Sequence, residues 1–156
     1  MAKYNVKPEF LCEVEAYLNP VPIGPGSWGT RIIFNVEGGS VKGPEINGKL
    51  SAFGADWGII RQDNCLELDV RILIETDDSV LIHTYYKGII DMTKEQVDTF
   101  LGGAIPENLS IYVTPRFETT HEKYRWMNRI QAIGRGSVGI VDNRIVVSYS
   151  WYKLGA

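Results

Sequence analysis

Apolar and charged residues alternate along much of this chain, most clearly between Leu66 and Glu75. In that stretch the even positions are all aliphatic and most of the odd positions are charged. Because successive side chains of a β-strand point to opposite faces, this pattern predicts a strand with one dry face. Similar runs predict strands at Phe10–Leu18, Thr30–Glu37, Val80–Ile90, Leu109–Glu118, Asn128–Arg135 and Arg144–Lys153, with shorter strands at Gly48–Ala52 and Trp57–Arg61.

Turn residues and one helical segment complete the predicted architecture. Clusters of Gly, Pro, Asp and Asn separate the runs at the spacing of antiparallel hairpins. Thr93 as N-cap, Gln96 three residues later and Gly102 at the end predict one short helix near residues 93–102. A second helical turn is expected near His121–Trp126. We therefore predict a mainly β fold in which residues 1–156 form a single antiparallel β-barrel domain of about 8–10 strands, calycin- or lipocalin-like, with the helix across one end.

Composition narrows the class of protein. The chain has 156 residues, 44% of them hydrophobic, which suits one globular domain. Cys12 and Cys65 form no CxxC pair, so neither a disulfide framework nor a four-cysteine zinc site is expected. The chain shows no apolar leader and no membrane-length apolar run, which predicts a cytoplasmic protein without a membrane partner. The net charge of −3 gives no support for nucleic-acid binding.

The known catalytic and cofactor-binding motifs are either absent from this sequence or lack the structural context that they require. Gly134–Gly139 reads GxGxxG, but no helix follows it to bind a pyrophosphate, and a glycine-rich hairpin explains it better. His83 and His121 lack metal-ligand spacing, so no metal site is expected. There is no GxSxG nucleophile elbow. We therefore expect no cofactor.

Two groups of polar residues remain as candidates. Asp56 lies between small residues and beside Trp57, where it either caps a turn or is a desolvated carboxyl group with a raised pKa that transfers protons. Asp69 and Arg71 share one face of their strand, where the guanidinium group could hold an anion. If that face points into the barrel, the interior is chemically useful. If it points outward, these are ordinary surface charges.

Further candidates lie on the later strands. Glu118 shares a face with Tyr112, and Trp126 and Asn128 follow at a spacing of two. An Asn beside aromatic residues could orient a substrate carbonyl, although core aromatics with a hydrogen-bonded Asn explain the pattern equally simply. His83 alternates with Tyr85, which suits either a structural strand histidine or a proton-transfer group.

Several motifs in a fixed order resemble a known family. They are IGPGSWGTR (23–31), GGSVKGPEINGKL (38–50), GADW (54–57), LDVR (68–71), TDDSVLI (76–82), TPRFET (114–119), YRWMNR (124–129) and GRG (134–136). Together they resemble the uncharacterised protein family 0311, numbered 3237 among the domains of unknown function. The resemblance spans nearly the whole chain. It implies a calycin-like antiparallel barrel, commonly oligomeric, and no established activity.

The resemblance also selects residues. The family pattern is matched at Arg31, Gly43, Asp56, Trp57, Asp69, Arg71, Asp78, Glu118, Trp126 and Asn128, and it is broken at Ser79, where the family favours glycine. Our first hypothesis is a cofactor-free lyase, isomerase or cyclase that acts by acid–base chemistry on a small aromatic or carbonyl-bearing metabolite inside the barrel. Its catalytic residues would be Asp56, Arg71 and Glu118. Its substrate-binding residues would be Trp57, Tyr85, Tyr112, Asn128, Arg31, His83 and Trp126.

A second hypothesis is a non-catalytic barrel that carries a small molecule, as lipocalins do. Aromatic walls would then supply the affinity, and the charged residues would be structural. A scaffold protein has less support, because no extended apolar stripe exists beyond the strands. In either main hypothesis the partner is a small-molecule ligand, and the family habit implies a homo-oligomer, which we expect to be a dimer.

Overall fold

Nine strands and two short helices make up the computed structural model, which describes residues 3–155. The strands are β1 (Lys7–Gly26), β2 (Gly29–Lys42), β3 (Asn47–Ile60), β4 (Cys65–Thr76), β5 (Leu81–Asp91), β6 (Ile111–Val113), β7 (Arg116–Glu118), β8 (Ala132–Val141) and β9 (Arg144–Gly155). The helices are α1 (Lys94–Leu101) and the 3₁₀ helix η1 (Glu122–Arg129).

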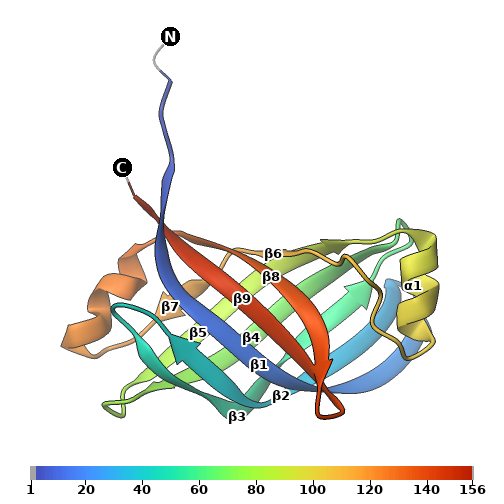
Figure 1. Cartoon of the computed structure of the whole chain (residues 1–156), viewed down its shortest axis with the longest axis horizontal. Coiled ribbons are helices and arrows are strands. Elements are labelled where there is room, and N and C mark those ends of the chain that lie inside the picture. The colour runs from blue at the N-terminus through green and yellow to red at the C-terminus, as the bar shows by residue number, and fades with distance from the viewer. Residues whose placement is uncertain (1–2, 156) are drawn as a thin grey trace.

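The strands form one antiparallel sheet that closes on itself (Figure 1). The order is β4-β3-β2-β1-β9-β8-β6-β5-β7, and a further pairing of β4 with β5 completes the ring. β6 and β7 both pair with β5, at Gly88–Ile90 and at His83–Tyr85. They therefore share one position in the ring, interrupted at the fully buried Pro115, which has no backbone N–H to donate. The predicted antiparallel barrel is confirmed.

The barrel interior is the hydrophobic core. In β4 the aliphatic positions Leu68, Val70 and Ile72 are buried, whereas the intervening Asp69 and Arg71 face outward. β5 shows the same alternation along its whole length, because successive side chains of a closed sheet point alternately into the barrel and to its outer face. The polar face of β4 is thus the outer face, and the aliphatic face is the inner one.

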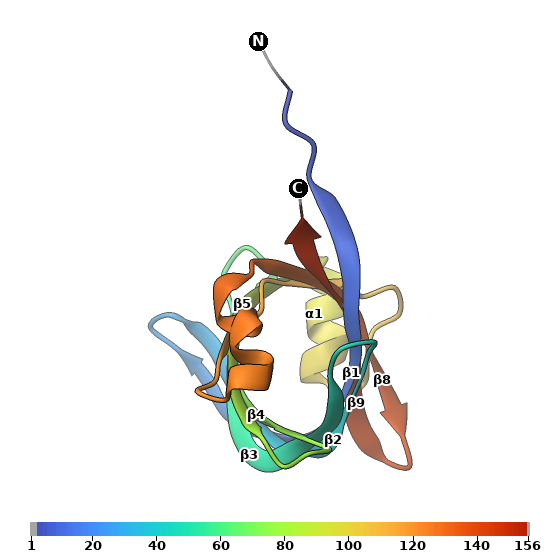
Figure 2. The same ribbon diagram turned by 90° about the vertical axis from the view of Figure 1, so that its left-hand side faces the viewer.

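Helices lie at both ends of the barrel (Figure 2). α1 begins with the predicted capping box, in which the Thr93 side chain accepts from the Gln96 N–H and the Gln96 side chain accepts from Thr93. Val97 is the only buried residue of α1. At the opposite end, η1 is joined to the β4–β5 turn by Asp78, which accepts hydrogen bonds from Tyr124 at 2.6 Å and from Lys123 at 2.7 Å.

Several local predictions differ from the structure. The strand predicted at Leu109–Glu118 is split into β6 and β7, and the two short strands predicted at Gly48–Ala52 and Trp57–Arg61 form one strand, β3. Gly134–Gly139 lies within β8 and is not a hairpin. The hairpin is at Asp142 and Asn143, both with positive φ, which the short side chains of Asp and Asn tolerate. The strand predicted at Asn128–Arg135 begins only at Ala132, because the preceding residues form η1. Within residues 3–155, no helix is both long enough and apolar enough to span a membrane.

Candidate functional site

A cavity of about 50 Å³ lies inside the barrel. Its walls are mostly aliphatic and aromatic side chains from the strands, together with Met92 and the α1 residue Phe100. Asp56 is the only charged residue among those lining it, and only 8% of Asp56 is exposed. Since a buried carboxyl group in an apolar wall is costly, this residue is the natural starting point for a site.

The backbone of β3 directs Asp56 inward. The β3–β4 register shifts between Leu50 and Gly54, and Gly54 has a φ of 91°. A Cβ atom at Gly54 would lie 2.0 Å from the carbonyl oxygen of Arg71, so the position needs glycine. After this bulge, Asp56 pairs with Val70 and lies on the inner face.

The carboxyl group of Asp56 takes part in the sheet. Its Oδ1 accepts a hydrogen bond from the backbone N–H of Asp69 at 2.9 Å. Burial raises the pKa of Asp56 from 3.8 to about 7, and the nearby negative charge of Asp69 acts in the same direction. The Asp69 N–H and the positive charge of Arg31 oppose the rise. Asp56 therefore changes protonation close to neutral pH.

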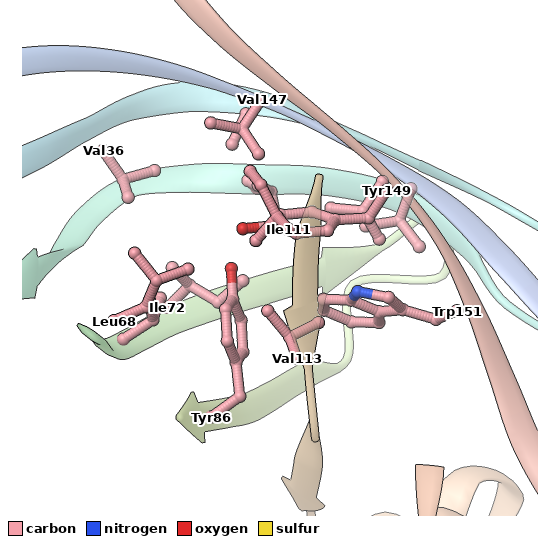
Figure 3. Close-up of a cluster of buried hydrophobic side chains, with 14 of the residues drawn as sticks. Val36, Leu68, Ile72, Tyr86, Ile111, Val113, Val147, Tyr149 and Trp151 are labelled. Carbon is pink, nitrogen blue, oxygen red and sulfur yellow. The ribbon is translucent and has the colours of Figure 1, made fainter. Parts of the chain in front are cut away.

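Two tyrosines from other strands complete a polar cluster around Asp56. Tyr86 on β5 and Tyr149 on β9 line the same cavity, and Figure 3 shows their hydroxyl groups directed into one space. Each phenol lies close enough to the other to affect its pKa. Burial raises the pKa of both phenols, and the charge of Asp56 raises both further, so both are neutral donors at ordinary pH. The edge of Tyr86 packs against the ring of Trp151, with centroids 5.6 Å apart.

The cluster of Asp56, Tyr86 and Tyr149 has the parts of an acid–base site. A carboxyl group with a pKa near 7 can both give and take a proton at neutral pH. Neutral phenols can donate hydrogen bonds to a developing oxyanion. No Lys or Arg lines the cavity, so an anionic ligand would lack a charged partner there.

Two further polar atoms inside the barrel make no hydrogen bond within the described chain. They are Thr84 Oγ1 and Trp151 Nε1, and both residues are fully buried. Neither residue lines the cavity. Among residues 3–155, no group of three or more His, Cys, Asp or Glu side chains is placed to hold a metal ion.

Arg71 and Glu118 do not join Asp56, so the predicted convergence of the three is wrong. The Arg71 side chain lies on the outer face and donates to Asp69 at 3.1 Å. Glu118 is 74% exposed and lies 3.5 Å from His83. Since β4 buries its aliphatic positions, its charged positions must face the solvent.

The outer face also carries most of the predicted substrate-binding residues. The His83 ring stacks on Tyr85 with centroids 5.2 Å apart, and Tyr85 pairs with Arg71 across the β4–β5 ladder. Arg31 donates to the carbonyl oxygen of Trp57 at 2.9 Å. Three of these aromatic residues are substantially exposed, namely Trp57, Tyr85 and Tyr112. Five of the predicted substrate-binding residues lie on this face, and none of them lines the internal cavity. They are Arg31, Trp57, His83, Tyr85 and Tyr112.

Asn128 and Trp126 belong to the η1 end of the barrel. The Asn128 side chain accepts from the Thr119 N–H and donates to the Thr119 carbonyl, both at 2.8 Å. Its amide is thus occupied in holding η1 against the strand end. Trp126 is half-buried and lies beneath the Lys153 ammonium group at 5.2 Å. Neither residue lines the internal cavity.

Tyr86 and Tyr149 were missed from the sequence, although a signal was present. Tyr86 is in phase with Ile82 and Ile90, whereas Tyr85 is in phase with His83 and Lys87. The charged and polar partners mark the odd positions as outer ones, so only Tyr86 can face the core. Tyr149 alternates with two serines in the same way.

Comparison with known proteins assigns the chain to a family. The family model described as "Protein of unknown function (DUF3237)" matches residues 6–154. The chain belongs to the DUF3237 family. A UPF0311 protein of Rhodopseudomonas palustris strain TIE-1 is 36% identical over 121 residues, which cover 76% of this chain and 78% of that protein. A UPF0311 protein of Clostridium acetobutylicum is 33% identical over 101 residues, 64% of each chain. The predicted family resemblance is confirmed.

Solved structures share the fold of this DUF3237 chain. A β-barrel-like protein of Acinetobacter baumannii covers 99% of both chains with a TM-score of 0.79 and 29% identity. A conserved protein of unknown function from Rhodopseudomonas palustris has a TM-score of 0.83 and 27% identity, covering 98% of this chain and all of that one. A protein of Penicillium herquei described as an enzyme has a TM-score of 0.69 at 21% identity, covering 98% of each chain. At that identity the likeness concerns the fold alone.

Proposed function

We propose that this DUF3237 protein is an acid–base enzyme that binds a small carbonyl-bearing or phenolic metabolite inside its barrel and needs no cofactor. Asp56 would transfer the proton, and Tyr86 and Tyr149 would donate hydrogen bonds to the substrate oxygen. The observation that carries the proposal is the placement of one carboxyl group, with a pKa of about 7, in an otherwise apolar cavity beside two phenols. Lyases, isomerases and cyclases of this type abstract a proton beside a carbonyl and stabilise the resulting enolate.

The roles differ from those expected from the sequence. Arg71 and Glu118 lie outside the barrel, so the inner phenols take over the stabilisation first assigned to the Arg71 guanidinium group. A neutral phenol suits this task in an apolar cavity, because it adds no buried charge before the reaction begins. The enzyme described from Penicillium herquei has the same fold, which is compatible with catalysis on this scaffold.

The test is a deuterium-exchange screen. Simple ketones, 1,3-diketones and phenols are incubated in D₂O, and NMR follows the loss of their exchangeable carbon-bound protons. We expect the protein to accelerate exchange of at least one compound class and Asp56→Asn to lose about 100-fold or more of that rate. Asp91→Asn is the matched control, because Asp91 is an exposed carboxylate on β5 that does not line the cavity. Equal rates in the Asp56→Asn and native proteins would refute the role of Asp56.

A carrier remains the second candidate, and the almost wholly apolar lining of the cavity favours it. In that case a ligand would bind with affinity and no compound would exchange protons. Asp56→Asn would then change affinity or stability alone.

A further inference from the structure

A groove, larger than the cavity, adjoins it at the α1 end of the barrel. It measures about 510 Å³ and lies between the β1–β2 hairpin and the segment that follows α1. Three residues, Phe34, Phe100 and Ile145, line both this groove and the internal cavity. These three side chains therefore separate the groove from the internal cavity.

The groove and the cavity are separated by side chains, which can change rotamer. The rings of Phe34 and Phe100 are 6.2 Å apart at their centroids and tilted by 47°. Phe100 and Ile145 are only partly buried, and Phe100 lies in the last turn of α1. Because Val97 is the only buried residue of α1, the helix contributes little to the core, and Phe100 lies between the groove and the cavity on this lightly packed element.

The size of the cavity limits what it can hold. A water molecule needs about 10–15 Å³ by the same measure, so about 50 Å³ admits a group of only a few non-hydrogen atoms. Drug-sized ligands occupy sites of about 300–1,000 Å³. The cavity alone therefore suits the reacting end of a ligand, and any larger part must lie elsewhere.

The chemistry of the groove indicates what that larger part is. None of its lining residues is charged, and most are apolar, including Pro20, Pro22, Ile32, Leu101 and Ile105. The cavity likewise has no cationic residue to receive an anion. An uncharged oxygen-bearing head and an apolar tail satisfy both spaces.

We infer that the ligand is a neutral amphiphile whose ketone or phenol head lies beside Asp56, Tyr86 and Tyr149, and whose apolar tail passes Phe100 into the groove. This inference rests on the proposed function for the identity of the head. It adds a second subsite, and with it a preference for long apolar substituents.

NMR chemical-shift titration with 2-alkanones from 2-butanone to 2-nonanone tests the inference, with 4-alkylphenols as a second series. We expect affinity to rise about two- to four-fold for each added methylene, since every methylene buried is removed from water. Leu101→Glu and Ala104→Glu place a charge in the groove at exposed positions. Each should weaken 2-nonanone binding at least about ten-fold and leave 2-butanone unchanged.

Thr99→Glu is the matched control, because Thr99 is an exposed α1 residue that lines neither space, and it should change neither ketone. A plateau of affinity at the shortest ketone, an equal loss for short and long ketones in the groove variants, or no binding in either series would overturn the inference. Chain-length-dependent binding without any deuterium exchange would instead support this second subsite and overturn only the catalytic role.

Discussion

Replacing Asp56 by Asn should make the protein more stable at alkaline pH and should remove part of its pH dependence. Asn has nearly the same shape, and its Oδ1 can still accept from the Asp69 N–H. An acid whose pKa is raised on folding holds its proton more tightly in the folded state. Its contribution to the free energy of unfolding is therefore complete below the unfolded pKa of 3.8 and is lost as the pH rises to about 7.

The size of the effect follows from the two pKa values. The rise from 3.8 to about 7 is roughly three pH units, which at about 1.4 kcal/mol per unit amounts to about 4 kcal/mol in total. About 2–3 kcal/mol of this falls between pH 5 and pH 8, a range in which stability is easily measured. The residue is almost fully buried, so solvent screening takes little from this value.

Urea unfolding of both proteins at several pH values provides the assay. The difference in unfolding free energy between Asp56→Asn and the native protein should grow by about 2–3 kcal/mol from pH 5 to pH 8, in favour of the variant. Groups that titrate alike in both proteins cancel in this difference. Asp91→Asn, at an exposed carboxylate outside the cavity, is the matched control. A constant difference for Asp56→Asn would refute the claim that Asp56 titrates near neutrality.

Three further predictions concern other parts of the molecule. Asp78→Ala removes the acceptor of Lys123 and Tyr124, so hydrogen exchange of the η1 amides should accelerate. Asp77→Ala should leave this exchange unchanged, and equal exchange rates in the two variants would contradict the role of Asp78. Asn128→Ala loses two hydrogen bonds to Thr119 and should lower the free energy of unfolding by about 1–2 kcal/mol in urea, against an unchanged midpoint if the amide is dispensable. Burial raises the pKa of Cys12 to about 12, so a thiol reagent should label it only after unfolding, and rapid labelling of the native protein at pH 8 would disprove this.

The sequence was a good guide to the barrel because period-two alternation is a local property. The strand at Leu66–Glu75 and the capping box at Thr93 are both visible in a few residues, and both are present in the structure. The start of the strand predicted at Asn128–Arg135 was misplaced, since Asn128 is fixed in η1 by contacts with Thr119, which lies nine positions away. Such tertiary hydrogen bonds produce no periodic pattern in the sequence.

The candidate site was only partly predictable. Asp56 could be found because a carboxylate between small residues and a Trp is unusual, and desolvation was one of its two interpretations, the other being a turn cap. Its partners Tyr86 and Tyr149 come from strands far apart in the chain, and only closure of the sheet brings them together. Arg71 was misassigned because a charged strand face was read as a possible interior, although a filled barrel buries the aliphatic face.

The pairing of β1 with β9 has a consequence for how the protein folds. Residues of β1 from Lys7 to Leu18 pair with residues of β9 from Gly155 back to Ile145. One edge of β1 therefore has no partner until β9 has been synthesised, and the ring closes through contacts that span most of the chain. Contacts of such large sequence separation slow folding, because the entropy of loop closure is lost before the contacts form. Until β9 pairs with β1 the sheet has two unpaired edges, and it is this pairing that closes the wall around the interior holding Asp56.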